Sequence, residues 1–359
     1  MPRKTVGLVA PLPPQVGGVA GFAEWLLAHE KAIGYRFDAF DLWRPATGGV
    51  GGRLSLHAVA IQARLLPRFL RWLRTAPRVV HYCVSATGTG LGRDLVFLTA
   101  LRLSRRRVIG HLQVVPEGAP VRSRALRALD ASITRWVTVA PSSAERLAEI
   151  GIRAAWIPNP IRFDSNGHGQ QASRSGFRLL FVGRYGERKG CRELIAALAR
   201  ARDADVEATL RFVGREEHEG EEASLRDAVA GYGLGGKVEF AGVKDGDALA
   251  ACYAEADVLC LPSHREGVPL AILEGMSFGL PVIATPVGGI PDFVSSDENG
   301  LLVPPGDVAA LAEAITTLAL DSSLRSRLWA AAREGVRAQA GSETVANRWH
   351  EVYSEVEAL

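Results

Sequence analysis

The stretch from residue 256 to residue 294 limits the possible folds of this chain more than any other part of it. Two short apolar runs, ADVLCLP and LPVIATP, each end in a proline and are typical of buried strands. Between them, Pro269 and Gly279 bracket a helical pattern, with proline near its start and glycine just past its end. A strand, a helix and a second strand joined by short loops predict parallel strands with a right-handed crossover, and therefore an α/β fold.

The loop SHREGVP follows the first of these strands, at the edge where parallel sheets bind ligands. Glu266 lies in this loop and Glu274 lies about one helical turn into the helix, so both are expected to face one crevice. The backbone N–H groups of Gly267 and Val268 suit a polyhydroxyl or anionic ligand, because they lie at a helix N-terminus. Alternatively, Glu266 only complements the helix dipole and Glu274 is an exposed helical residue.

A second candidate loop lies in FRLLFVGRYGERKG, where a predicted strand ends at Gly183. Arg184 and Lys189 follow it, directly before the next predicted helix. Two cations at a strand end beside a helix N-terminus suit a diphosphate group. The pairs Asp203/Asp205 and Asp245/Asp247 fall in predicted loops and are interpreted as solvated, so no metal site is expected.

These segments resemble the retaining glycosyltransferases of family 4. EGVPLAILE resembles the Glu-x7-Glu element of that family, GLPVIATPVGGIPDFV its continuation, and FVGRYGERKG its diphosphate-binding loop. The resemblance implies the GT-B fold, in which two Rossmann-like domains face each other across a cleft. It also implies a metal-independent hexosyltransferase that takes a UDP- or GDP-linked sugar, retains the anomeric configuration and needs no cofactor.

The resemblance assigns roles to individual residues. It implies that Arg184 and Lys189 bind the diphosphate, that Glu274 binds the ribose and that the nucleoside base lies near Val243. His111 lies near the carboxyl end of the predicted strand RVIGHLQ, and the resemblance implies that it contacts the donor sugar. Arg93 stands just past another strand end, and its position there predicts that it can reach a phosphate. The expected catalytic residues are Glu266, His111, Lys189 and Arg184, and the expected substrate-binding residues are Gly17, Gly18, Arg184, Lys189, Val243, Glu266, Gly267, Val268, Pro269 and Glu274.

A chain of 359 residues is long enough for two domains. We expect an N-terminal acceptor-side domain over residues 1–163 and a polar linker over 164–176. A nucleotide-sugar-binding domain is expected over 177–342, and the resemblance implies that a final helix, about 343–359, packs back on the first domain. No run of eighteen apolar residues occurs, and the four cysteines lack metal or redox spacing, so a cytoplasmic protein is expected.

Charge is unevenly distributed along the chain. Residues 1–165 carry 23 Lys and Arg against 10 Asp and Glu, a net +13, whereas residues 166–359 carry 19 against 29, a net −10. Arg64, Arg68, Arg71 and Arg74 share one face of a predicted helix that contains Pro67. They predict either peripheral attachment to an anionic membrane surface, suited to a lipid-linked acceptor, or an ordinary solvated helix face. No nucleic-acid-binding motif accompanies the basic half.

Several functions remain compatible with these residues. The first is glycosyl transfer in cell-envelope glycolipid or polysaccharide synthesis. The others are a nucleotide-sugar epimerase, a phosphorylase or a non-catalytic nucleotide-sugar-binding subunit on the same fold, and a nucleic-acid-binding protein. The absence of a recognisable pyridoxal-binding lysine disfavours a phosphorylase, and the intact set of charged loop residues disfavours a non-catalytic subunit. The donor base, the sugar and the acceptor are not determined by these patterns.

Overall fold

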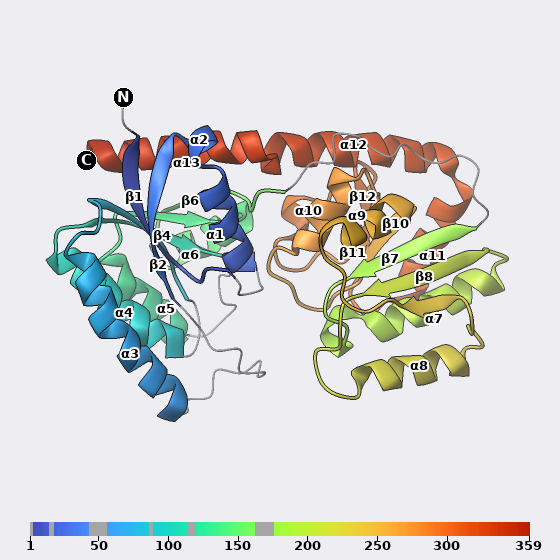
Figure 1. Ribbon diagram of the computed structural model, residues 1–359. Coiled ribbons are helices and arrows are strands. Elements are labelled where there is room, and N and C mark those ends of the chain that lie inside the picture. Colours follow the sequence, from blue (N-terminus) through green and yellow to red (C-terminus); the bar gives the residue numbers. More distant parts are fainter. Residues whose placement is uncertain (1–2, 14–17, 43–55, 86–88, 114–119, 162–175) are drawn as a thin grey trace. The chain divides into compact units, whose positions relative to one another are not determined.

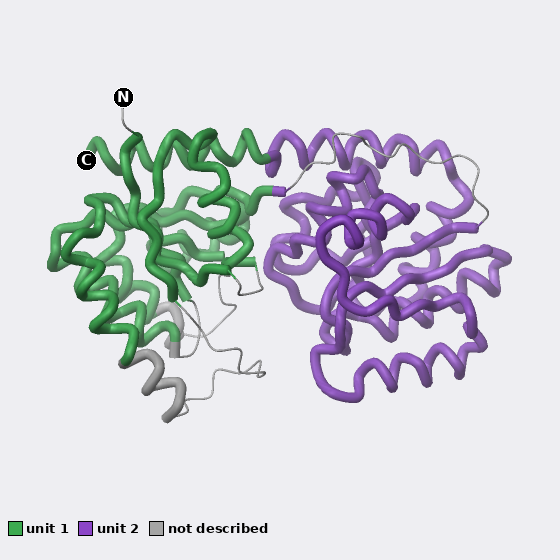
Figure 2. The backbone as a smooth tube through the Cα atoms, in the orientation of Figure 1, with its two compact units in different colours: residues 1–160, 342–359 green, residues 161–341 purple. Residues whose placement is uncertain are grey.

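The computed structural model describes the chain except for residues 1–2, 14–17, 43–55, 86–88, 114–119 and 162–175. The chain divides into two compact units, Met1–Pro160 with Ser342–Leu359, and Ile161–Gly341. Figure 2 colours these units separately. Each unit contains one six-stranded sheet in which all the paired strands run parallel, and helices flank both sheets. The predicted α/β fold class is confirmed.

In the first unit the sheet order is β2-β1-β3-β4-β5-β6. Its strands are β1 (Lys4–Ala10), β2 (Tyr35–Asp41), β3 (Val79–Cys83), β4 (Arg107–Leu112), β5 (Arg135–Thr138) and β6 (Ala154–Trp156). Its helices are α1 (Gly18–Ala28), α2 (Glu30–Ile33), α3 (Leu56–Leu73), α4 (Thr89–Leu103), α5 (Pro120–Asp130), α6 (Pro141–Glu149) and α13 (Ser342–Ala358). Pro67 lies inside α3 without ending it.

Each face of this sheet has its own apolar core. One core contains Phe69 of α3 and Phe97 of α4, whose rings stack with centroids 4.0 Å apart. The other contains Phe22 of α1 and Trp349 and Tyr353 of α13. The C-terminal helix α13 therefore belongs to the sheet cover of the first unit, since its apolar side chains are buried there.

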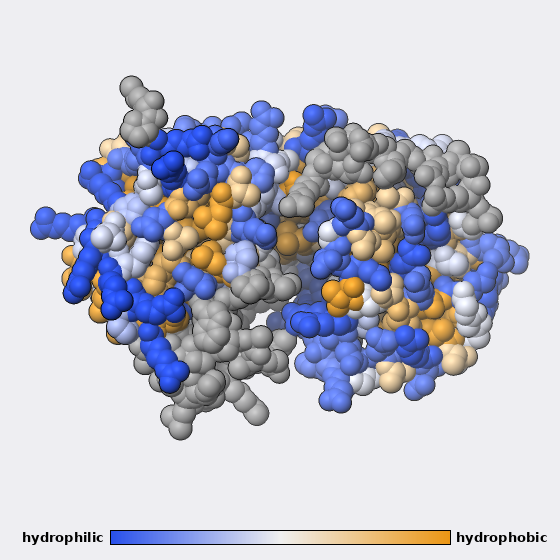
Figure 3. All heavy atoms as spheres, in the orientation of Figure 1, coloured by the Kyte–Doolittle hydropathy of each residue, from blue (hydrophilic) through white to orange (hydrophobic). Residues whose placement is uncertain are grey.

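In the second unit the sheet order is β12-β11-β10-β7-β8-β9. Its strands are β7 (Phe177–Val182), β8 (Ala208–Val213), β9 (Val238–Phe240), β10 (Val258–Leu261), β11 (Val282–Ala284) and β12 (Gly300–Leu302). Its helices are η1 (Glu187–Lys189), α7 (Cys191–Asp203), α8 (Glu221–Gly231), α9 (Gly246–Glu255), α10 (Leu270–Ser277), η2 (Ile290–Asp292), α11 (Val308–Leu320) and α12 (Ser322–Ala340). On the face drawn in Figure 3, hydrophilic side chains cover much of both units.

The segment from β10 to β11 folds as its sequence predicts. Both strands are fully buried and pair in parallel. Pro269 caps the N-terminus of α10, and Gly279 follows its end with a φ of +82°. Gly275 brings α10 close to the sheet, because a Cβ at this position would lie 2.8 Å from the Leu259 side chain. Glycine has a low helix propensity, but at this position it allows α10 to pack closely on β10, which offsets that cost.

Candidate functional site

The strand order of the second sheet places a ligand site beside β7. From β7 the chain builds β8 and β9 on one side, and β10, β11 and β12 on the other. The loops that follow β7 and β10 therefore leave the carboxyl edge of the sheet next to each other and diverge. Such a switch point is where open α/β sheets bind their ligands, in a crevice outside the strand ends.

The loops after β7 and β10 are in close contact. Gly190, which ends the first loop, has a φ of +67°, and a Cβ on it would lie 2.0 Å from the Pro262 carbonyl oxygen. Only glycine allows this approach of the two backbones. The His264 N–H also donates to the Arg188 carbonyl oxygen at 2.9 Å. The loop after β7, with Arg184 and Lys189, and the loop after β10, with Glu266, thus form one surface.

An ion pair joins these two loops. The Lys189 Nζ of η1 donates to the Glu266 Oε1, and the Ser263 hydroxyl donates to the same oxygen at 2.8 Å. The Lys189 and Glu266 side chains are only 12% and 6% exposed. Both charges are therefore largely withdrawn from water, which strengthens their interaction with each other and with a charged ligand.

A third loop, which follows β11, completes the surface. Gly288 has a φ of +61°, and a Cβ there would lie 2.2 Å from the Glu266 carbonyl oxygen. The Gly289 N–H donates to the Gly267 carbonyl oxygen at 2.7 Å. The sequence pattern alone gives this loop no functional role, although a glycine pair after a buried strand indicates close backbone approach.

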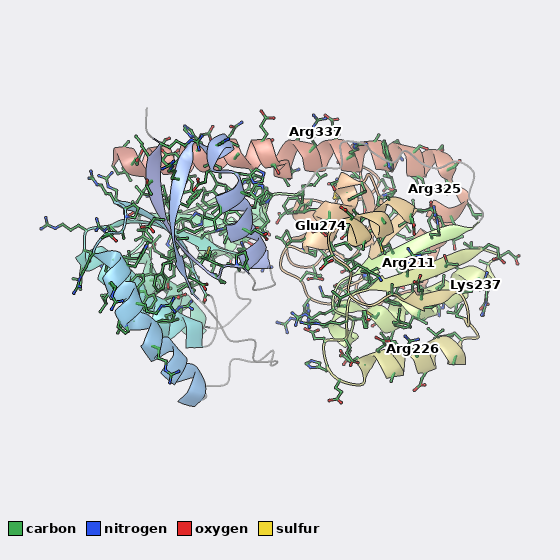
Figure 4. All side chains as sticks on the ribbon, viewed as in Figure 1. Arg211, Arg226, Lys237, Glu274, Arg325 and Arg337 are labelled. Atoms are coloured by element: carbon green, nitrogen blue, oxygen red, sulfur yellow. The ribbon has the colours of Figure 1, made fainter. Side chains whose placement is uncertain are left out.

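Glu274 lies on α10, within the second unit (Figure 4). The Tyr253 hydroxyl of α9 donates to the Glu274 Oε2 at 2.7 Å. Burial raises the pKa of the Glu274 carboxyl above its ordinary value, and the Tyr253 hydrogen bond partly opposes this shift. The alternative reading of Glu274 as an exposed helical residue is therefore wrong, since its carboxylate is held inside the unit.

The other predicted residues of this unit lie around the three loops or beyond them. Arg184 is exposed and lies two residues beyond the end of β7. Gly267 is exposed, and Val268 and Pro269 are partly buried at the start of α10. Val243 lies in the segment between β9 and α9 and is 66% exposed. The structure thus joins Lys189 and Glu266 directly, whereas Glu274 lies within α10 and Val243 follows the edge strand β9.

Two predicted residues of the first unit have different settings. His111 lies one residue before the end of β4 and is 1% exposed. Its ring packs edge-on against the Phe22 ring, with the two centroids 4.6 Å apart. Burial lowers the pKa of the His111 imidazole to about 3, so the ring is neutral at physiological pH. Gly18 is exposed at the first position of α1, and Gly17 falls outside the described residues. The expected linker, apart from Gly176, also falls outside them.

The expectation for Arg93 is wrong. Its guanidinium is 1% exposed and pairs with the buried Asp94 carboxylate at 2.7 Å. The Tyr82 hydroxyl donates to the same carboxylate oxygen. Because its charge is already neutralised inside the first unit, Arg93 does not offer a phosphate site.

The second unit is similar in sequence to known proteins. Residues 169–335 match the family model described as glycosyl transferases group 1. A phosphatidyl-myo-inositol mannosyltransferase of Mycobacterium leprae is 36% identical over 197 residues, 54% of this chain and 51% of that protein. A putative colanic acid biosynthesis glycosyltransferase of Escherichia coli, WcaL, is 32% identical over 173 residues, 46% of this chain and 42% of that protein. The matched region lies within the second unit and covers less than half of the chain.

The fold extends over both units. The crystal structure of Anabaena HepE in complex with UDP matches with a TM-score of 0.74 and 19% identity, covering 98% of this chain and 100% of that one. Together with the two parallel sheets, this match identifies the GT-B fold. The sequence matches to the two curated relatives span only about half of their length or less. Among the described residues, no helix has the length and apolar content of a membrane span.

Proposed function

We propose that the chain is a hexosyltransferase that moves a sugar from a nucleoside-diphosphate sugar to an acceptor with retention of configuration. The observation that carries this proposal is the Lys189–Glu266 ion pair, which lies at the switch point of the second sheet. The segment that contains this pair matches a glycosyltransferase family model. A buried cation beside strand ends suits the diphosphate, and a carboxylate in the same crevice suits sugar hydroxyls. A UDP-linked sugar is the favoured donor, since HepE of the same fold was solved with UDP.

In the proposed mechanism, Lys189 and Arg184 stabilise the negative charge that develops on the β-phosphate as its bond to the sugar breaks. Glu274 accepts hydrogen bonds from the ribose hydroxyls, with the Tyr253 hydroxyl supporting its charged form. Glu266 binds sugar hydroxyls and stabilises positive charge at the anomeric carbon. His111 donates a hydrogen bond to a sugar hydroxyl. The acceptor then attacks on the face from which the diphosphate leaves, which gives retention.

A donor screen tests the proposed function and separates it from its alternatives. The full chain is incubated with UDP- and GDP-linked hexoses, with and without acceptors, and thermal shift and product analysis are measured. Stabilisation by one donor is expected through mass action. Glycosyl transfer that requires an acceptor supports the proposal. Conversion of the sugar with donor alone indicates an epimerase, and binding without turnover indicates a non-catalytic subunit.

Glycosyl transfer is expected to proceed without a divalent metal. Two carboxylates assigned to this site are already engaged, Glu266 by Lys189 and Ser263, and Glu274 by Tyr253. Two cations therefore take the place that a metal occupies in other transferases. Initial rates with excess EDTA should match those without it. Loss of activity on chelation, restored by Mg²⁺ or Mn²⁺, would show that this assignment of charges is wrong.

The proposed acceptor is lipid-linked and is reached at the cytosolic membrane surface. The two relatives named above support this proposal, because their names refer to a phosphatidyl-inositol acceptor and to colanic acid biosynthesis. On α3 and just beyond it, Arg64, Arg68, Arg71 and Arg74 are exposed while Phe69 is buried. Large apolar side chains are also exposed on α3 and on the neighbouring α4, namely Leu70, Leu95, Val96 and Leu103. Basic and apolar side chains together favour an anionic interface.

Binding to anionic vesicles is therefore expected, and binding to neutral vesicles is not. Near an anionic leaflet each basic residue contributes about 1 kcal/mol. Replacing the four arginines by glutamine should abolish most of the co-sedimentation, and added salt should weaken it. A matched control replaces four exposed arginines of the second unit, Arg192, Arg200, Arg202 and Arg226. Equal pelleting of the two variants would show that the basic face of α3 is an ordinary solvated helix face, and it would favour a soluble acceptor.

A further inference from the structure

Three side chains that carry polar atoms meet inside the core of the first unit. His81 and Cys83 are two positions apart on β3, so their side chains point to the same face of the sheet. His111 lies on β4, in register with Cys83. The exposed fractions of the three residues are 0%, 4% and 1%. This face is the one covered by α1 and α13, whose Phe22 and Trp349 rings pack against the two imidazoles.

Hydrogen bonds connect the two histidines to the C-terminal helix. The Tyr353 hydroxyl of α13 lies 2.7 Å from His81 Nδ1. On the other side of the same ring, His81 Nε2 lies 3.2 Å from His111 Nδ1. Within the described part of the chain, His111 Nε2 is buried and has no hydrogen-bond partner. A row of polar atoms thus runs from α13 through β3 to β4 and ends at that nitrogen.

The positions of the protons along this row follow from the need of each donor for an acceptor. Tyr353 is 0% exposed, so its O–H requires an acceptor in the core, and His81 Nδ1 fills that role. His81 then carries its single proton on Nε2 and donates to His111 Nδ1, which leaves the proton of His111 on Nε2. In the reverse order His81 donates to Tyr353, and the hydroxyl loses this acceptor. Burial lowers the pKa of both imidazoles, which keeps each ring at one proton.

We propose that Tyr353 and His81 are positioning residues that hold His111 in the tautomer whose proton lies on Nε2. This inference rests on the proposed function, in which His111 contacts a sugar hydroxyl. In that tautomer the buried Nε2 of His111 is a hydrogen-bond donor and has no lone pair with which to accept a proton. His111 therefore does not act as a general base through this atom.

His81, Cys83 and His111 could alternatively bind a metal ion. One ligand atom from each of His81, Cys83 and His111 lies within 4.8 Å of the others. We favour the hydrogen-bonded arrangement because the two ring nitrogens that face each other are already within hydrogen-bond distance and because Tyr353 supplies the proton order. The two arrangements predict different spectra, so one experiment distinguishes them.

The direct test is the tautomer itself. The full chain is labelled with ¹⁵N in its histidine rings, and two-bond ¹H–¹⁵N correlations are recorded, with His81→Gln and His111→Gln spectra for assignment. In the wild type both histidines should carry the proton on Nε2. Tyr353→Phe should turn His81 and His111 into mixtures of both tautomers. Tyr35→Phe is the matched control, since it removes another hydroxyl that bonds to α13, at Ser354 and Glu357, and it should leave both signals unchanged.

Kinetics supply the second readout. If the two tautomers become equally populated, kcat/KM falls about twofold in Tyr353→Phe, because activity scales with the competent fraction. Tyr35→Phe should keep the wild-type value. A His111 proton on Nδ1 in the wild type, or tautomers unaffected by Tyr353→Phe, overturns the proposal. Spectra that change on EDTA treatment also overturn it and indicate a metal site. The expected tautomers in a chain without transferase activity support the relay and refute the proposed function alone.

Discussion

Replacing Lys189 by alanine is expected to lower kcat/KM for glycosyl transfer by about 10²–10³-fold, because loss of one preorganised donor to a developing anion commonly costs ~2.7–4 kcal/mol. The lysine is held in place before the substrate arrives, since Gly190 fixes its loop against Pro262 and Glu266 binds its ammonium group. Its removal also leaves the Glu266 carboxylate, 6% exposed, without its counter-charge beside an anionic leaving group. Both effects raise the barrier.

Lys237→Ala is the matched control for this variant. Lys237 directly precedes β9 and therefore lies at the amino edge of the same sheet, opposite the proposed site (Figure 4). The substitution removes an exposed ion pair with Glu207, and such pairs contribute little to stability. Arg184→Ala should lower kcat/KM in the same direction but less, because the side chain is exposed and screened by solvent. Near wild-type turnover in Lys189→Ala would remove this loop from the mechanism.

The parts of the site that the sequence predicts are those set by local rules. The prolines and glycines around α10 mark its ends, and the apolar runs on both sides are too short for helices, so β10, α10 and β11 follow from neighbouring residues alone. Parallel pairing then places Glu266 and Lys189 at strand ends. Their direct contact, however, depends on β10 pairing with β7 rather than with another strand. That choice is made by the whole sheet.

The polar contacts inside the first unit could not be predicted from the sequence either, because they also depend on how distant segments pack together. Arg93 stands just past a strand end, where a phosphate ligand is expected, but in the folded unit its guanidinium is buried against Asp94. His81 and His111 come together through the register of β3 with β4, and Tyr353 joins them from a helix far along the chain. A single histidine at a strand end gives no sign of such partners. Their arrangement nevertheless has a measurable consequence for stability.

Acidification is expected to destabilise the first unit between pH 6.5 and pH 5. Burial lowers the pKa of His111 to about 3 and that of His81 well below its ordinary value, with the neighbouring His111 adding to the shift of His81. In the unfolded chain both histidines titrate near pH 6.5, so below that pH the unfolded state binds more protons and gains stability relative to the folded one. A histidine shifted in this way costs about 1.4 kcal/mol per pH unit below pH 6.5, so His111 alone costs about 2 kcal/mol by pH 5, and His81 adds to this loss. The loss is a substantial part of the 5–15 kcal/mol typical of a domain.

Hydrogen–deuterium exchange of the β3 and β4 peptides measures this loss, because opening of those strands reports on the first unit alone. His111→Gln keeps a hydrogen-bonding side chain but does not titrate, so it should lower stability at pH 7 while reducing the slope of the opening free energy by about 1.4 kcal/mol per pH unit. His218→Gln, at an exposed position of the second unit, should leave the slope unchanged. Equal slopes in wild type and His111→Gln would mean that His111 takes up a proton in the folded state, and the neutral hydrogen-bonded row from Tyr353 to His111 would then be wrong.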